Sequence, residues 1–84
     1  MKKVIIYGRE NCLYCSKAKE LSEANGISFE WIDVTEGDRK QELLSLVPNA
    51  KTVPQIFVNG VHVGGFTEYE EYVAENLRGV GDLQ

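Results

Sequence analysis

The sequence predicts a single α/β domain, a mixed four-stranded sheet with helices packed on it, in the order β-α-β-α-β-β-α. The chain has 84 residues, of which 43% are hydrophobic, so it is long enough for one small core and too apolar for a disordered segment. Apolar runs of strand length alternate with segments of helical periodicity. Two such runs flank Asn59-Gly60, the strongest short hairpin signal. We expect one domain over residues 1–84, with residues 79–84 as a flexible tail.

The first half of the chain predicts a βαβ unit. Val4 to Tyr7 are four consecutive apolar residues, which indicates a strand buried on both faces. A helix should follow from about Asn11 or Cys12 to Asn25, because apolar residues then recur with helical spacing. These recurring residues are Tyr14, Ala18 and Leu21. A second strand is expected over residues 27–34, parallel to the first because a right-handed crossover joins them.

The second half predicts two helices around a hairpin. Asp38 and Gln41 form a capping-box pair, which predicts the start of a helix. Residues 55–63 hold two short apolar runs that should pair as antiparallel strands. A second capping-box pair, Thr67 and Glu70, predicts that the last helix opens there.

Charge and hydropathy narrow the classes of function. Nine basic and 13 acidic residues give a formal net charge of −4 without a basic tract, which argues against nucleic acid as a partner. No apolar run approaches the roughly 20 residues of a membrane span, and the chain opens without a signal-peptide pattern. We therefore expect a cytoplasmic monomer, in a compartment where thiols are kept reduced, with no membrane partner.

Both cysteines of the chain lie three positions apart, in the segment YGRENCLYCSKAKE just after the first strand. A structural zinc site needs four ligands, whereas the chain offers Cys12, Cys15 and one distant histidine, His62. His62 alternates with valines and is expected to face solvent. A structural disulfide across so short a loop would restrict the unfolded chain little, and the cytosol would reduce it. A catalytic thiol pair remains.

The position of the pair favours catalysis. Free N–H groups at a helix start carry roughly half a positive charge, which favours a thiolate over a thiol. Arg9 adds a cation, and Lys51 could approach from another loop. Cys12 is nearer to the helix start and should be the more exposed, so it is the expected nucleophile. Cys15, one turn later, is placed to resolve a mixed disulfide.

Three segments together resemble the dithiol glutaredoxins: CLYC after the first strand, TVPQIF at residues 52–57 and GGFTE at residues 64–68. The resemblance extends from Lys3 to about Leu77. It implies a thioredoxin-like fold and a thiol–disulfide oxidoreductase that uses glutathione as co-substrate. The expected substrates are protein disulfides and glutathionylated proteins, with ribonucleotide reductase as one candidate partner.

The resemblance also implies the residues of a glutathione cleft. They are Arg9, Tyr14, Thr52, Val53, Pro54, Gly65, Phe66, Thr67 and Glu68. A cis bond between Val53 and Pro54 would turn the Val53 backbone toward Cys12. That backbone could then pair with the cysteinyl unit of glutathione like a short antiparallel strand.

The resemblance assigns the charged ends of glutathione to three places. Arg9 would hold the glycyl carboxylate. The backbone amides of Phe66 and Thr67, at a helix start, would hold the γ-glutamyl carboxylate. Glu68 would neutralise the ammonium group, and Tyr14 would lie against the ligand.

One residue departs from the common C-P-Y-C motif of the family, since Leu13 stands where proline is usual. Bridging iron–sulfur clusters are known in the wider family mainly where that proline is absent. A [2Fe–2S] carrier, with Cys12 and glutathione from two monomers as ligands, is therefore an alternative function, and no other metal is expected. A redoxin recharged by thioredoxin reductase is a further alternative, but similar proteins of that kind lack the GGFTE-type anion loop.

Overall fold

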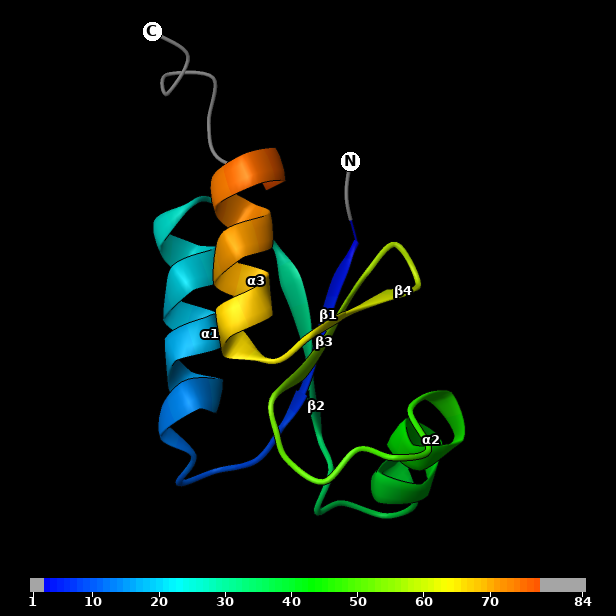
Figure 1. The fold of residues 1–84 in the computed structure, drawn as a ribbon. Coiled ribbons are helices and arrows are strands. Elements are labelled where there is room, and N and C mark those ends of the chain that lie inside the picture. The colour runs from blue at the N-terminus through cyan, green and yellow to red at the C-terminus, as the bar shows by residue number, and fades with distance from the viewer. Residues whose placement is uncertain (1–2, 78–84) are drawn as a thin grey trace, which may run out of the picture.

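The computed structural model describes residues 3–77, so the expected tail at residues 79–84 lies outside the described part (Figure 1). Four strands and three helices follow one another in the predicted order. They are β1 (Val4–Gly8), α1 (Leu13–Ala24), β2 (Phe29–Asp33), α2 (Arg39–Leu46), β3 (Gln55–Val58), β4 (Val61–Gly64) and α3 (Phe66–Tyr72), which a π-helical turn, η1 (Val73–Leu77), continues. None of the helices in residues 3–77 combines the length and the apolar character that a membrane span requires.

The four strands form one mixed sheet in the order β2-β1-β3-β4. β1 is parallel to β2 and antiparallel to β3, and β3 is antiparallel to β4. The second strand is shorter than predicted, since it covers residues 29–33 of the expected 27–34. The predicted βαβ unit, hairpin and fold class are confirmed.

Successive residues of the central strands point to opposite faces of the sheet, and each face has its own core. On one face Ile6 and Ile56 pack with Ala18 and Tyr69 beneath α1 and α3, which lie side by side in Figure 1. Ser22 on α1 donates to the Ala18 carbonyl at 3.0 Å, so the Tyr69 hydroxyl donates its proton to Ser22 Oγ at 2.6 Å. This buried pair ties the two helices together.

Of the helices in residues 3–77, α2 covers the opposite face (Figure 1). Leu43 of this helix is buried against Tyr7 and Phe57 of the sheet. The Tyr7 hydroxyl donates to Glu42 Oε2 at 2.6 Å, and Arg39 Nη1 donates to the other oxygen of Glu42 at 2.7 Å. One apolar side chain and one hydrogen-bonded carboxylate thus fix α2 on the sheet.

Both predicted capping boxes are wrong in detail. Asp38 is the residue before α2, but its side chain makes no capping hydrogen bond, so the pair with Gln41 does not form. Its backbone, with φ −96° and ψ 16°, departs from the extended conformation in which an N-cap side chain reaches the helix amides.

The last helix begins earlier than predicted. β4 runs to Gly64, whose φ of 131° turns the chain at once, so α3 starts at Phe66 and not at Thr67. Gly65 is the N-cap, and its N–H donates to Glu68 Oε1 at 3.0 Å. The acidic residue of the capping interaction is therefore Glu68, two positions before the predicted Glu70.

Candidate active site

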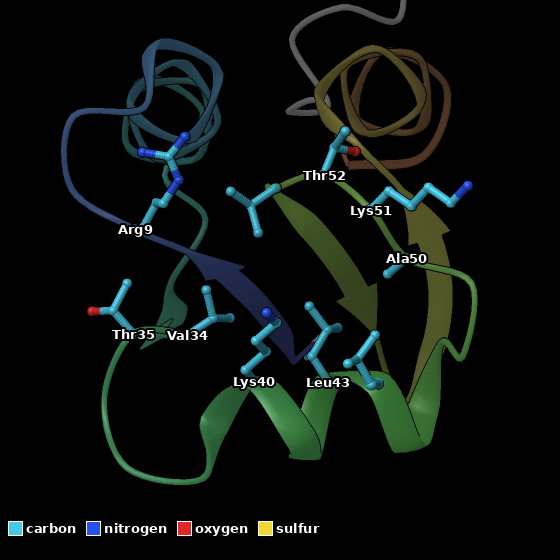
Figure 2. Close-up of a pocket in the computed structure, with 10 residues that line it drawn as sticks. Arg9, Val34, Thr35, Lys40, Leu43, Ala50, Lys51 and Thr52 are labelled. Atoms are coloured by element: carbon cyan, nitrogen blue, oxygen red, sulfur yellow. The ribbon is translucent and has the colours of Figure 1, made fainter.

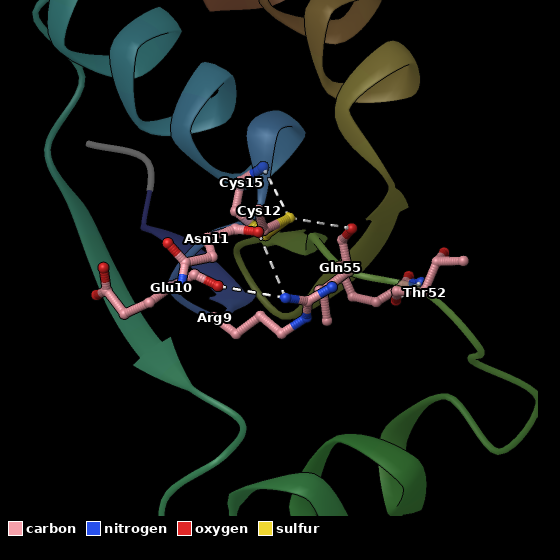
Figure 3. The surroundings of a disulfide bond; sticks show 8 residues. Arg9, Glu10, Asn11, Cys12, Cys15, Thr52 and Gln55 are labelled. Carbon is pink, nitrogen blue, oxygen red and sulfur yellow. Dashed lines mark hydrogen bonds between the residues drawn. A yellow bond between two sulfur atoms is a disulfide. The ribbon is translucent and has the colours of Figure 1, made fainter.

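The sulfur pair lies at the start of α1, beyond the polar loop that follows β1. Cys12 is the N-cap residue of α1 in an extended conformation, with φ −125° and ψ 111°. Its Sγ accepts a hydrogen bond from the Cys15 backbone N–H at 3.2 Å, and the two side chains form a disulfide (Figure 3). The sulfur of Cys12 therefore occupies the place of a capping oxygen, where the free amides of the helix point.

The two cysteines differ in exposure as the sequence predicts. Cys12 is half-buried, whereas Cys15 is only 1% exposed. Cys12 Sγ also lies 3.7 Å from the carbonyl oxygen of Val53. Of the two sulfurs, solvent therefore reaches that of Cys12, which lies beside the Val53 backbone.

The segment before β3 brings the other two motifs to the sulfur pair. The bond between Val53 and Pro54 is cis, the isomer that the resemblance implies. The Pro54 carbonyl oxygen comes close to Gly65, at 3.6 Å from the place that a Cβ there would take. Val53 and Pro54 therefore connect the start of α1 to the start of α3.

A hollow of about 750 Å³ opens beside Val53 (Figure 2). Its described lining is Arg9, Val34, Thr35, Lys40, Leu43, Leu44, Ala50, Lys51, Thr52 and Val53. Three of these residues are cationic and none is acidic, although the chain as a whole carries a net charge of −4. The hollow thus has an apolar floor and a cationic rim, which suits an anion with apolar parts.

The three cations of the hollow point in different directions. Lys40 points into the hollow from α2, whereas the Lys51 ammonium points away from it (Figure 2). The expected approach of Lys51 to the sulfur pair stays a prediction. Arg9 Nη1 donates only weakly to its own loop, to the carbonyls of Glu10 at 3.3 Å and Asn11 at 3.5 Å, so most of its donor groups remain available to a ligand.

The residues of the expected cleft form two groups on either side of Cys12. Arg9, Thr52 and Val53 belong to the hollow. The second group lies at the starts of α1 and α3 and is not part of the hollow; it consists of Tyr14, Gly65, Phe66, Thr67 and Glu68. Within it the rings of Tyr14 and Phe66 pack with centroids 5.8 Å apart. Pro54 lies between the two groups.

Sequence reasoning missed two contributors to this arrangement. Lys40 carries no motif, and only the placement of α2 brings it to the hollow. His62, expected as a plain solvent-facing residue, is exposed but pairs through Nε2 with Gln55 Oε1 at 2.7 Å. Gln55 in turn donates to the Thr52 carbonyl at 2.9 Å, so this chain of hydrogen bonds holds the loop beside Cys12.

Metal ligands do not gather at the site. Within residues 3–77 no group of three or more His, Cys, Asp or Glu side chains is arranged to hold a metal ion.

Comparisons with known proteins agree with this arrangement. The glutaredoxin family model matches residues 4–63. Glutaredoxin 1 of Escherichia coli K12 is 38% identical over 80 residues, which cover 87% of this chain and 94% of that protein. Glutaredoxin 1 of Francisella tularensis, solved as a complex with cacodylate, has a TM-score of 0.76 at 32% identity and covers 89% of this chain and 95% of its own. A buckwheat glutaredoxin–glutathione complex is 24% identical and shares the fold with a TM-score of 0.75. The match covers 88% of this chain and 70% of the buckwheat chain.

The family match includes the sulfur pair, the Val53–Pro54 segment and the whole sheet up to Val63. The resemblance that three short motifs suggest is thus confirmed over most of the chain. With a C-x-x-C pair at the start of α1 and relatives at this level of identity, the chain belongs to the glutaredoxin family of thiol–disulfide oxidoreductases.

Proposed function

We propose that the chain uses glutathione to reduce protein disulfides and glutathione mixed disulfides, with Cys12 as the nucleophile. The observation that supports this proposal most directly is that Cys12 is the more exposed of the two cysteines and that its Sγ accepts a hydrogen bond from the Cys15 backbone N–H at 3.2 Å. A hydrogen bond to a charged group contributes about 1.5–3 kcal/mol, which favours the thiolate of the reduced protein. The positive end of the helix acts in the same direction.

The reaction then has two exchanges. The Cys12 thiolate attacks one sulfur of the substrate disulfide, the new Cys12–substrate bond forms, and the other sulfur departs as a thiolate. Cys15 next attacks Cys12 Sγ, the Cys12–substrate bond breaks, and the second substrate sulfur departs and takes up the proton of Cys15. Where that second sulfur belongs to glutathione, another glutathione thiol can instead attack it, which releases Cys12 as a thiolate and forms oxidised glutathione. When Cys15 attacks, the Cys12–Cys15 disulfide remains, and two glutathione molecules reduce it and leave as oxidised glutathione.

The two groups around Cys12 suit the two carboxylates of glutathione. Arg9, on the cationic rim of the hollow, is the proposed partner of the glycyl carboxylate. The amides of Phe66 and Thr67 lie in the first turn of α3, where no carbonyl of the helix pairs with them, so they are proposed to bind the γ-glutamyl carboxylate. Glu68 has one oxygen on the Gly65 amide, which leaves the other for the ligand ammonium.

Three further contacts of the proposed complex involve the middle of the ligand. The Val53 backbone, beside Cys12 Sγ, would pair with the cysteinyl unit, and Thr52 would border it on the side of the hollow. Tyr14 would flank the γ-glutamyl unit with its exposed ring. The buckwheat relative that has the same fold is itself a glutathione complex, which supports glutathione as the ligand class.

A coupled assay tests the proposal, with glutathione and glutathione reductase in one arm and thioredoxin reductase in the other. Turnover should depend on glutathione. Cys15→Ser should keep the removal of glutathione from mixed disulfides and lose most reduction of protein disulfides, whereas Cys12→Ser should lose both. Turnover that thioredoxin reductase supports without glutathione would contradict the proposal, and the reverse pattern in the two variants would exchange the roles of the cysteines.

Arg9→Ala tests the cleft itself. Loss of one charge-assisted hydrogen bond should weaken glutathione-dependent turnover by roughly ten-fold or more. Lys3→Ala is a matched control, because it removes the same charge at the other end of β1, outside the hollow. Equal kinetics of the two variants would remove Arg9 from the site.

A further inference from the structure

The space behind the sulfur pair, at the end of β1, is filled by a side chain that the proposed reaction does not use. A Cβ atom on Gly8 would lie 2.5 Å from Cη2 of Trp31 and 2.9 Å from Cys15 Sγ. Both atoms therefore occupy the space beside the glycine, and a residue with a side chain would collide with them. The indole of Trp31, from β2, thus lies next to the inner sulfur.

Lys19 holds the same indole from α1. Its Nζ lies 4.0 Å from the centroid of the Trp31 ring, within the range of a cation–π interaction. Lys19 is four residues after Cys15 and therefore on the same face of α1. Both Lys19 and Trp31 are half-buried, while Cys15 is 1% exposed. The indole is in contact with a cation at its face and with Gly8 and the sulfur at its edge.

We propose that Trp31, held by Lys19, is a wall that closes Cys15 off from solvent, so that Cys15 reacts only with Cys12. This inference rests on the proposed function, because it takes Cys12 as the attacking and Cys15 as the resolving sulfur. Trp31 is thus a positioning residue, which acts through Cys15 and does not touch the substrate.

The wall has a consequence for the second exchange. In the reduced protein an incoming disulfide reaches Cys12 alone. The Cys12 thiolate attacks it, the S–S bond of the substrate breaks, and the mixed disulfide forms on Cys12. The Cys15 sulfur then supplies the electron pair from inside the wall, its bond to Cys12 forms, and its proton passes to the departing substrate thiolate. If the wall were open, a glutathione thiolate could attack Cys15 in the Cys12–Cys15 disulfide and form a mixed disulfide there, with Cys12 as the leaving thiolate. Cys12 would then no longer be the only sulfur that exchanges with molecules from solvent.

Alkylation of Cys15 in a Cys12→Ser background tests the wall without any glutathione. Serine keeps the N-cap of α1, so the helix start is preserved. With a bulky maleimide as probe, Trp31→Ala should speed the reaction of Cys15 by roughly ten-fold or more, because exposure controls thiol reactivity. Trp31→Phe should restore most of the protection, and thermal unfolding should show that the variants are folded.

The lysine is tested with a neighbour as control. Lys19→Met should speed alkylation of Cys15 by roughly two- to five-fold, since the indole loses the cation that holds it. Lys17→Met should have no effect, because Lys17 Nζ lies over the Tyr14 ring, at 5.6 Å, and not over Trp31. If Cys15 were alkylated at equal rates in the Cys12→Ser parent and in its Trp31→Ala variant, Trp31 would not shield Cys15. If the two lysine variants were alkylated at equal rates, Lys19 would not hold Trp31 in place.

Fluorescence provides a second measurement, in the unmodified protein. Trp31 is the single tryptophan of the chain. A disulfide in contact with an excited indole quenches its emission, so reduction of the protein should raise the emission of Trp31. Cys12→Ser, which has no disulfide, should show no change under the same reductant. Emission that stays constant on reduction would overturn the contact, whatever the glutathione assay shows. A failed glutathione assay with both measurements as expected would refute the proposed function alone.

Discussion

Replacing Tyr7 with phenylalanine isolates one hydrogen bond that fixes α2. The Tyr7 ring is 3% exposed and packs edge-on against Phe57 with centroids 5.6 Å apart, which phenylalanine preserves. The variant loses the 2.6 Å bond from the hydroxyl to Glu42. Hydrogen bonds to charged groups contribute about 1.5–3 kcal/mol. Because Glu42 is half-exposed and solvent can replace the lost donor, we expect the free energy of unfolding at neutral pH to fall by about 1–2 kcal/mol.

The same hydroxyl makes stability depend on alkaline pH. Burial, followed by the hydrogen bond and the charge of Glu42, raises the pKa of Tyr7 from 10.0 to about 12. A raised pKa means that the folded state favours the neutral hydroxyl, so this stabilisation is complete below pH 10 and is lost between pH 10 and about 12. A shift of two units corresponds to at most about 2.7 kcal/mol. Tyr7→Phe should lack this part of the alkaline loss.

The acid side should respond in the opposite sense. The hydroxyl of Tyr7 and, after it, Arg39 lower the pKa of Glu42, so the carboxylate stabilises the fold above its usual pKa and this contribution is lost as the pH falls through the lowered value. Tyr7→Phe removes the larger of these two causes. The free energy of unfolding of the variant should therefore fall less steeply in acid than that of the parent.

Urea unfolding of parent and variant across these pH ranges measures both effects. The difference between the two curves matters, because other tyrosines titrate in both proteins. Tyr14→Phe is the matched control, since it removes a hydroxyl from a side chain that is 53% exposed. If the difference between parent and Tyr7→Phe stayed constant between pH 10 and 12, the assigned role of the hydroxyl would be wrong.

Two further predictions concern residues next to the sulfur pair. Gly8→Ala should destabilise the fold by about 1–3 kcal/mol in urea unfolding, because its Cβ would lie 2.5 Å from the Trp31 ring, and unchanged stability would contradict that packing. Leu13→Pro tests the cluster carrier: if two chains bridge a [2Fe–2S] cluster, anaerobic reconstitution with iron, sulfide and glutathione should give a coloured dimer that the variant loses. Proline is tolerated at Leu13, the first residue of α1, so the variant should still fold. A colourless monomer from the parent would eliminate the carrier.

Local patterns in the sequence were sufficient for the order of the elements and for the position of the sulfur pair. The apolar run from Val4 to Tyr7 and the Asn59-Gly60 turn each act through neighbouring residues, and both appear in the structure as predicted. The start of α3 was mispredicted because its signal is not local. Thr67 is a better cap by residue type than Gly65, but the end of β4 and the turn at Gly64 decide where the helix begins.

The hollow could not be predicted from motifs because it depends on the placement of α2. Lys40 enters the hollow only because Leu43 packs on the sheet and Glu42 accepts the Tyr7 hydroxyl, a contact across 35 positions of the chain. The resemblance to the family identified Arg9 and Thr52 as site residues, but not Lys40 and Leu43, which line the same hollow. The contact between Trp31 and Gly8 likewise requires the register of β1 against β2.

Three consecutive residues at the end of β1 connect these observations. Tyr7 points to the α2 face and fixes the helix that carries Lys40, whereas Gly8 points to the α1 face and leaves room for the indole of Trp31. Arg9 then leaves the sheet and joins the rim of the hollow. Because neighbouring residues of a strand act on opposite faces, a change at Tyr7 should alter binding at the hollow and leave the protection of the inner sulfur intact. A change at Gly8 should do the reverse.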